Sequence, residues 1–282
     1  RSISSFKTKS QPYLDLVAKL QDAISSKDKP AAQQTIFDIK KKREQLDKAA
    51  AQRNAKKLFG KGQSTTFDES AYTKERKDKA IWCKTSSSSV NKFKGKADEI
   101  YNAASKDEQD AAWRYTSGSG YVNRPLRGYD GAWGKSNFKG IGNVPLDNEN
   151  PLALKDIDNL TNLINKSTYD KDIWLQRGVD DGGLAGFLQL ESLDESRLNA
   201  LVGQSITDTA FMSCGAAKGT GFGGNIINIY CPKGTKMLYI DGRSAYASEN
   251  EMLIQRNTRF RITKVEKSGW RYFIDVEVVG QI

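Results

Sequence analysis

The stretch Tyr246-Ala247-Ser248-Glu249-Asn250-Glu251-Met252-Leu253-Ile254 places two carboxylates one residue apart, directly before an apolar run that indicates a strand. Side chains alternate between the two faces of an extended chain, so Glu249 and Glu251 are expected to point the same way. Two like charges held this close resist joint ionisation where water is scarce, which suits acid/base or cation-stabilising chemistry. The same spacing also suits a solvated strand face, and the pattern alone does not choose between the two.

The chain of 282 residues exceeds the size of a typical single domain, so one large or two moderate domains are expected. No apolar run approaches the ~20 residues that a membrane span requires, and no transmembrane segment is expected. The sequence opens on Arg1 without an apolar signal-like stretch. We therefore expect a soluble protein, and this sequence to be a piece of a longer one.

Histidine is absent from the sequence, which excludes histidine-based triads, Cys/His dyads and His-ligated zinc. Catalysis would have to use carboxylates, hydroxyls or arginines. The three cysteines, Cys83, Cys214 and Cys231, are odd in number and lack Cys-x-x-Cys spacing. We expect free buried thiols rather than a disulfide framework or a zinc site, with a single disulfide as the alternative.

The net charge of +10 is concentrated in the front third of the chain. Residues 1–100 hold 23 Lys/Arg against 12 Asp/Glu, whereas residues 101–282 hold 21 against 22. Such a basic region suits contact with nucleic acid, an acidic membrane surface or an acidic protein, and equally a solubilising helical surface. No nucleic-acid motif with interleaved aromatic residues accompanies the lysines, so a nucleic-acid partner is not expected.

The front of the chain is predicted to be helical, because apolar residues recur at helical spacing from Leu14 to Ile24 and again from Ile36 to Leu58. A third helix is expected near residues 69–82, and the Ser/Thr cluster at 85–89 indicates a loop. The content of Gly, Trp and Tyr then rises, which places a domain boundary near residues 95–105.

The rest of the chain is predicted to combine helices with short strands. A helix is expected at 106–116 and an amphipathic helix at 152–165. Short apolar runs bounded by Gly, Pro or Asn predict strands at 173–177, 210–213, 225–231, 236–240, 251–254, 259–265 and 272–279.

Three elements follow one another in a fixed order in this half of the chain. They are an arginine that ends a strand (Trp174-Leu175-Gln176-Arg177-Gly178), a strand-borne serine (Phe211-Met212-Ser213) and the pair Glu249/Glu251. This order resembles the arginine-serine-glutamate class of mono-ADP-ribosyltransferase toxins, in particular the enzymatic component of actin-modifying binary toxins and the Rho-modifying exoenzymes. The resemblance covers residues 105–282 and leaves the front third outside it.

Two further segments support the resemblance. Tyr115-Thr116, followed by Tyr121-Val122-Asn123-Arg124-Pro125-Leu126-Arg127-Gly128, is similar to the family's entry segment, and 246–251 is similar to its aromatic turn-turn loop. The implied fold is α+β, with two packed, mostly antiparallel sheets, an NAD cleft between them and a helical region in front. The predicted domains are a basic helical region at 1–100 and a catalytic domain at 105–282.

The resemblance implies roles in NAD binding for four residues. Arg177 corresponds to the arginine that positions NAD, and a guanidinium suits phosphate or carboxamide oxygens because it offers a planar fork of donors. Gly178 permits close approach of the backbone to a ligand. Phe222 stands where the family places an aromatic that packs on the nicotinamide ring, although a core role fits equally. The family's basic residue shortly after this aromatic is missing here, and Arg127 is a candidate to supply that phosphate contact.

The resemblance also implies catalytic roles. Ser213 matches the first residue of the Ser-Thr-Ser strand, which orients the catalytic glutamate, but Cys214-Gly215 replaces the next two residues. Glu251 corresponds to the glutamate that stabilises the ribosyl cation as nicotinamide departs. Glu249 corresponds to the position that reads the acceptor, where a glutamate is typical of arginine-modifying members. Tyr246 would shape the acceptor side of the loop.

The implied activity is mono-ADP-ribosylation of a protein arginine, with NAD as substrate and no metal. The alternatives are an NAD glycohydrolase and a non-catalytic adaptor with the same fold, the latter favoured by Cys214-Gly215. Actin is the acceptor suggested by the resemblance, and secretion or injection into a target cell, with action in its cytoplasm, is the implied setting. The front region is expected to bind an acidic partner or surface or to assist delivery, so deletion of residues 1–100 should spare NAD hydrolysis.

Overall fold

The computed structural model describes residues 11–39, 42, 65–127, 151–190, 193–219, 224–240, 244 and 249–281. By its contacts the chain divides into two compact units, Arg1–Gly60 and Lys61–Ile282. In the described part of the chain, no helix is both long enough and apolar enough to cross a membrane.

The first unit contains the helix α1 (Gln11–Ser25) and a second helical stretch over 29–39. The turn between them includes Lys27, which has a positive φ of 58°. Tyr13, Leu20 and Ile39 form a small buried cluster that joins the two helices. The prediction of a helix from Leu14 to Ile24 is confirmed, whereas the predicted continuation to Leu58 lies largely outside the described residues.

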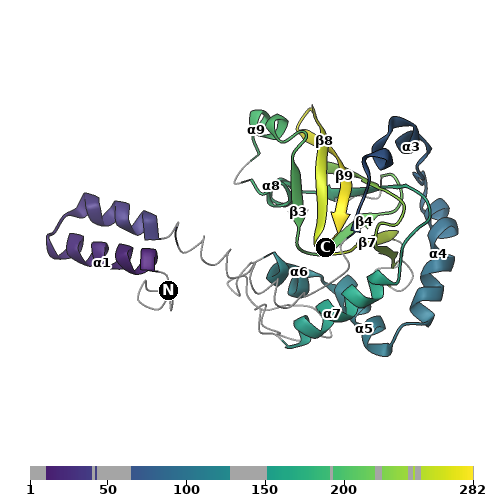
Figure 1. Cartoon of the computed structure of the whole chain (residues 1–282), viewed down its shortest axis with the longest axis horizontal. Coiled ribbons are helices and arrows are strands. Elements are labelled where there is room, and N and C mark those ends of the chain that lie inside the picture. The colour runs from purple at the N-terminus through teal and green to yellow at the C-terminus, as the bar shows by residue number, and fades with distance from the viewer. Residues whose placement is uncertain are drawn as a thin grey trace. The chain divides into compact units, whose positions relative to one another are not determined.

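The second unit combines helices with a sheet, which confirms the predicted α+β class (Figure 1). Its helices are the 3-10 helix η2 (Glu69–Tyr72), α3 (Lys74–Lys79), α4 (Ser86–Asn102), α5 (Lys106–Ser117), α6 (Gly120–Leu126), α7 (Pro151–Asn165), α8 (Asp181–Leu188) and α9 (Glu195–Ala200). Its strands are β1 (Thr65–Thr66), β2 (Ile173–Val179), β3 (Ser205–Asp208), β4 (Met212–Gly215), β5 (Asn225–Cys231), β6 (Met237–Tyr239), β7 (Glu251–Ile254), β8 (Thr258–Ser268) and β9 (Arg271–Gln281).

The strands form one hydrogen-bonded path in the order β3-β8-β9-β5-β2-β4-β7-β6, with β1 paired to β9. All neighbours are antiparallel except β5 and β9, which run parallel. The two expected sheets correspond to β3-β8-β9-β5-β2 and β4-β7-β6, which join where β2 meets β4 at the single pair Gln176↔Gly215. The sheet is therefore continuous, but its junction is narrow.

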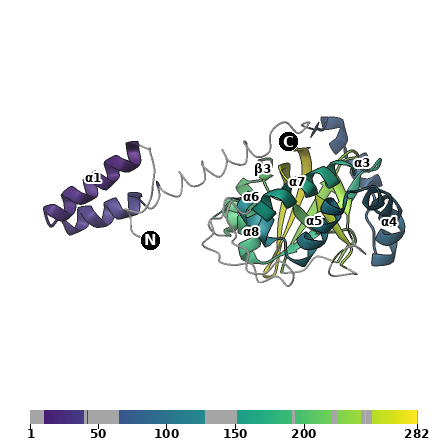
Figure 2. The same ribbon diagram turned by 90° about the horizontal axis from the view of Figure 1, so that it is seen from below.

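Helices α5, α6 and α7 lie together at one side of the sheet, and α4 lies at its margin (Figures 1 and 2). The inward face of α7 buries Ile157, Leu160 and Ile164, as its helical spacing predicted. A buried carboxylate on the same helix, Asp156, accepts two hydrogen bonds from the Arg114 guanidinium at 2.6 and 2.7 Å. These contacts fix α5 against α7, and the Tyr121 hydroxyl on α6 donates a hydrogen bond to the same carboxylate at 2.6 Å.

The predicted loop at 85–89 is wrong, because this segment begins helix α4. The Thr85 side chain caps the helix by accepting a hydrogen bond from the Ser88 backbone N–H. Phe93, Ala97 and Tyr101 then recur every four residues on the buried face of the helix. The serines looked like loop residues, yet they occupy the first turn of a helix held by tertiary packing.

Residues 65–104 belong to the larger unit rather than to the front of the chain. Strand β1 pairs with β9, and the Tyr72 hydroxyl donates a hydrogen bond to the Val278 carbonyl oxygen at 2.9 Å. The Tyr230 hydroxyl in turn donates to the Ala71 carbonyl oxygen at 2.8 Å. The boundary in the structure thus lies at Gly60, about forty residues before the one expected from composition.

Candidate active site

A cavity of about 290 Å³ opens beside the junction of β2 and β4. This volume is close to the lower end of the range of about 300–1,000 Å³ that is typical of small-molecule sites. Six of the eight residues singled out from the sequence line it, namely Arg127, Arg177, Gly178, Ser213, Glu249 and Glu251. The other two, Phe222 and Tyr246, lie outside the described residues.

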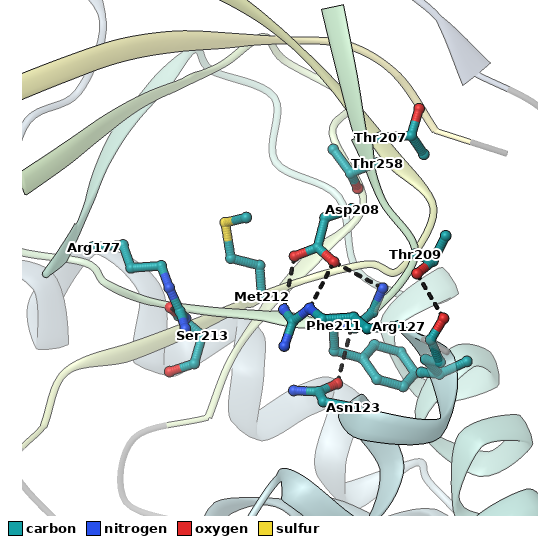
Figure 3. A network of polar contacts seen from close by, with 12 residues as sticks. Asn123, Arg127, Arg177, Thr207, Asp208, Thr209, Phe211, Met212, Ser213 and Thr258 are labelled. Atoms are coloured by element: carbon teal, nitrogen blue, oxygen red, sulfur yellow. Dashed lines mark hydrogen bonds and ion pairs between the residues drawn. The ribbon is translucent and has the colours of Figure 1, made fainter. Parts of the chain in front are cut away.

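Strand β2 carries Arg177 into the cavity from the centre of the sheet. The strand pairs with β5 along its whole length, from Ile173↔Cys231 to Val179↔Asn225. The Arg177 guanidinium donates a hydrogen bond to the backbone carbonyl oxygen of Ser213 on β4 (Figure 3). This contact joins the predicted NAD-binding arginine to the strand of the predicted orienting serine, across the narrow junction of the sheet.

Strand β4 places Ser213, Cys214 and Gly215 between β2 and β7. In register, Ser213 pairs with Leu253 and Gly215 with Glu251. The pKa of the Cys214 thiol is raised to about 12, mainly because the group is buried. The charge of Arg177 opposes this rise, and the charge of Glu251 adds to it. The thiol therefore stays neutral and is a poor nucleophile, so the departure from the Ser-Thr-Ser pattern adds a small buried group to the cavity wall rather than a reactive one.

Glu249 and Glu251 both line the cavity, but not for the reason expected from strand alternation. Strand β7 begins only at Glu251, and Asn250 between the two glutamates has a left-handed φ of 51°. The pair thus stands on a turn that leads into the strand, not on an extended segment. Glu251 is buried, at 6% exposure, whereas Glu249 is half-buried, which gives the two carboxylates unequal contact with water.

Arg127 reaches the cavity from the end of α6, and a buried carboxylate holds it there (Figure 3). Asp208, the last residue of β3, accepts hydrogen bonds from Arg127 Nε at 3.1 Å and Nη2 at 2.8 Å. The same carboxylate accepts a hydrogen bond from the Ala210 backbone N–H at 3.0 Å. Strand β3 and Asp208 were not predicted, although an acidic partner for an inward arginine is physically reasonable.

Besides Cys214 and Gly215, four cavity-lining residues were not predicted as site residues: Tyr115, Ser119, Asn123 and Gln176. Ser119, Asn123 and Arg127 are spaced four residues apart, so they share one face of a helix, and this periodicity could have found the first two. Asn123 also ties α6 to the sheet, because its side-chain oxygen accepts a hydrogen bond from the Phe211 N–H at 3.2 Å (Figure 3). Burial and the charge of Glu251 raise the pKa of Tyr115, so its hydroxyl remains protonated.

Gln176 connects the cavity to the interior of the sheet. Its side chain donates a hydrogen bond to Asn228 at 3.0 Å, and Asn228 donates to Asp275 at 2.8 Å, so three neighbouring strands are linked. The Gln176 side-chain oxygen accepts a hydrogen bond from the Gly219 N–H at 2.8 Å. Gln176 directly precedes Arg177 in a strand, and alternation puts neighbouring side chains on opposite faces, so the spacing gives no signal that both line the cavity.

The cavity thus combines two guanidinium groups with two carboxylates. The guanidinium groups, on Arg127 and Arg177, suit the phosphate oxygens of an anionic ligand. The carboxylates, Glu249 and Glu251, suit a cationic or hydrogen-bond-donating part of a ligand. Such an arrangement can hold a dinucleotide by its phosphates while presenting acids to its sugar.

A sequence model of a protein family, described as ADP-ribosyltransferase exoenzyme, matches residues 69–277. Plx2a, an ADP-ribosyltransferase toxin from Paenibacillus larvae, has a similar fold, with a TM-score of 0.56 and 20% identity over 70% of this chain and 97% of that chain. The Clostridium limosum C3 exoenzyme gives a TM-score of 0.54 and 18% identity over 71% and 97% of the two chains. C3stau2 from S. aureus, solved with NAD, gives 0.54 and 20% identity over 71% and 98%.

No curated protein sequence matches this chain. At identities of 20% or less, the likeness to the solved structures shows the fold alone. The family model, in contrast, covers most of the chain, from η2 to β9. The chain therefore belongs to the ADP-ribosyltransferase exoenzyme family of NAD-dependent ADP-ribosylating toxins.

Proposed function

We propose that this protein cleaves NAD between nicotinamide and ribose and transfers the ADP-ribose to an arginine of a target protein. The observation that carries the proposal is the cavity itself, in which Arg177, Ser213, Glu249 and Glu251 come together from three separate strands and a turn. Family membership supports the reaction type, and the acid pair supports the choice of acceptor.

Arg177 and Arg127 would bind the pyrophosphate of NAD. Both side chains line the cavity, and each is fixed by an acceptor from the protein, Ser213 O for Arg177 and Asp208 for Arg127. Fixed donors lose little conformational entropy when a ligand binds. The two positive charges match the two negative charges of a pyrophosphate.

Glu251 would stabilise the positive charge that develops on the ribose. The bond from ribose C1′ to the nicotinamide nitrogen breaks, its electron pair leaves with neutral nicotinamide, and C1′ becomes cationic. A buried carboxylate is effective here because little water screens it. Ser213 lies two residues before Gly215 on β4, and Gly215 pairs with Glu251. The Ser213 hydroxyl would orient the Glu251 carboxylate through a hydrogen bond when NAD is bound.

Glu249 would bind the arginine side chain that accepts the ADP-ribose. An arginine Nη attacks C1′, the new C–N bond forms, and the proton lost from the guanidinium passes to the Glu249 carboxylate. Glu249 is half-buried, so a side chain of another protein can reach it more readily than it can reach Glu251. Actin is a reasonable first acceptor to test, and the toxin character of the family supports action inside a target cell after secretion or injection.

The experiment that tests the proposal compares the wild-type protein with Glu249→Gln. We expect the wild type to release nicotinamide from labelled NAD and to label a small guanidino compound. Glu249→Gln should retain slow release of nicotinamide with water as acceptor but lose most labelling of the guanidino compound. Release without any guanidino labelling by the wild type would contradict the arginine acceptor and make the protein an NAD glycohydrolase, and no release at all would contradict the enzyme.

A further inference from the structure

Asn250 occupies the position between the two cavity glutamates with an unusual backbone conformation. Its φ of 51° lies in the left-handed region, which asparagine tolerates better than most residues other than glycine. Asn250 is nevertheless almost completely buried, at 1% exposure. A buried left-handed residue at this point determines how Glu249 and Glu251 are directed relative to each other.

The side chain of Asn250 is held from two other elements. The Ser89 hydroxyl, in the first turn of α4, donates a hydrogen bond to Asn250 Oδ1 at 2.6 Å. The Tyr239 hydroxyl, at the end of β6, lies 3.3 Å from the same oxygen and also donates to it. Ser89 and Asn250 are 161 residues apart in the sequence, so this contact is purely tertiary.

The backbone on both sides of the turn is fixed as well. The Asn250 carbonyl oxygen accepts a hydrogen bond from the Ala216 N–H at 2.7 Å, directly after β4. The Glu251 carbonyl oxygen accepts one from the Ile240 N–H at 3.0 Å. These backbone hydrogen bonds therefore fix the turn on both sides of Asn250, and the side chain of Asn250 anchors the turn to α4 and β6.

We propose that Asn250 is a positioning residue for the reaction, and that Ser89 on α4 holds it in place. The inference rests on the proposed function for what the two glutamates do, but it concerns residues outside the reacting groups. Asparagine meets two requirements at once: it accepts a left-handed φ, and it supplies an acceptor for Ser89 and Tyr239. Glycine would meet only the first requirement, and alanine would meet neither.

The chain contains a matched control for the backbone conformation. Asn257, in the turn between β7 and β8, has a φ of 56° and does not line the cavity. Replacing either asparagine by alanine puts a less tolerant residue into a left-handed backbone conformation, so the added backbone strain is similar in the two variants. A difference between the two variants in catalysis therefore reports the place of Asn250 in the site and not the strain of the backbone.

The first experiment measures nicotinamide release by the full chain for Asn250→Ala and Asn257→Ala, with thermal unfolding of both. We expect Asn250→Ala to lower kcat by about tenfold or more while the KM for NAD changes less than about threefold, because misdirected carboxylates lose transition-state contacts rather than ground-state binding. Asn257→Ala should leave both parameters unchanged. Equal kcat values for the two variants would overturn the proposal.

A double-mutant cycle keeps the test decisive even if Asn250→Ala fails to fold. Ser89→Ala removes one hydrogen-bond donor from a residue that does not line the cavity. It should lower kcat by about two- to tenfold, the worth of one buried hydrogen bond. Once Asn250→Gly has removed the acceptor, Ser89→Ala should have no further effect. Additive effects in the double variant would contradict the coupling.

Glu251→Gln separates failure of this inference from failure of the proposed function. If Glu251→Gln releases nicotinamide as fast as the wild type, the glutamate roles themselves are wrong and the positioning role falls with them. If Glu251→Gln is inactive while Ser89→Ala and Asn250→Gly match the wild type, the function stands and only the positioning role is overturned.

Discussion

The two sides of the cavity are constructed differently. On the acidic side, Glu249 and Glu251 stand on a tight turn whose geometry is set by backbone hydrogen bonds and by the buried Asn250. On the basic side, Arg127 and Arg177 are long side chains, each held by an acceptor from a neighbouring strand. We infer that the acidic side acts on the rate of the reaction and the basic side on the binding of NAD.

The largest expected effect tests the acidic side. Glu251→Gln keeps the size of the side chain but removes the negative charge that would face the ribose. We expect kcat for nicotinamide release to fall by about 100- to 1,000-fold, as for other groups that stabilise developing charge, with the KM for NAD close to that of the wild type. Steady-state kinetics with labelled NAD checks this, and a large rise in KM at constant kcat would assign Glu251 to the binding side instead.

The second-largest expected effect tests the basic side of the cavity, through Arg177. Arg177→Lys retains the positive charge but loses the planar fork of donors. We expect the KM for NAD to rise by about tenfold or more, with a smaller change in kcat, because pyrophosphate contacts are made equally in the ground and transition states. Equilibrium binding of NAD to the inactive Glu251→Gln protein, with and without Arg177→Lys, gives the same comparison without turnover. Unchanged affinity would exclude Arg177 from the NAD site.

A smaller effect is expected from the carboxylate that holds Arg127. Asp208→Asn would place an amide N–H against the guanidinium and loosen it, so the KM for NAD should rise by about three- to tenfold. Asp172→Asn is the matched control, because Asp172 also accepts two hydrogen bonds from one arginine, Arg76, and a third from the Lys233 N–H. Asp172 does not line the cavity. If both variants change KM equally, the effect of Asp208→Asn is one of stability alone.

The smallest effect is expected when the first unit is removed. Deletion of residues 1–60 should leave nicotinamide release within about twofold of the full chain, since both sides of the cavity belong to the second unit. Labelling of the protein target would fall if the first unit, with 14 Lys/Arg against 6 Asp/Glu, binds an acidic partner.

Deletion of residues 1–100 also removes β1, Tyr72 and Ser89 and should abolish release of nicotinamide. Retained release after the longer deletion would contradict the observed packing of residues 65–104.

The strands and helices with clear periodicity could be predicted from the sequence. Helices α5 and α7 and strands β2, β5 and β7 lie close to where apolar spacing placed them. Strand β3 (Ser205–Asp208) was not predicted, because Ile206 is its only apolar residue and no apolar run marks the segment. The boundary at Gly60 was missed because a change in charge or composition does not reveal which segment packs on which.

The residues of the site could be predicted in part, through resemblance rather than through spacing. Six of the cavity-lining residues were named in advance, since their order along the chain is typical of the family. The direction of Glu249 and Glu251 could not be derived, because Asn250 between them has a left-handed φ and its side chain contacts Ser89, which lies 161 residues earlier. Asp208 was missed for a similar reason, as its partner Arg127 comes 81 residues earlier.

The place of β9 in the sheet has a consequence for biosynthesis. This strand, residues 271–281, lies between β8 and β5 and also pairs with β1, more than 200 residues earlier. Until the ribosome has added these residues, β5 keeps an open edge and β1 has nothing to pair with. The sheet can therefore be completed only after translation of this segment, through contacts of long sequence separation, which slow its folding.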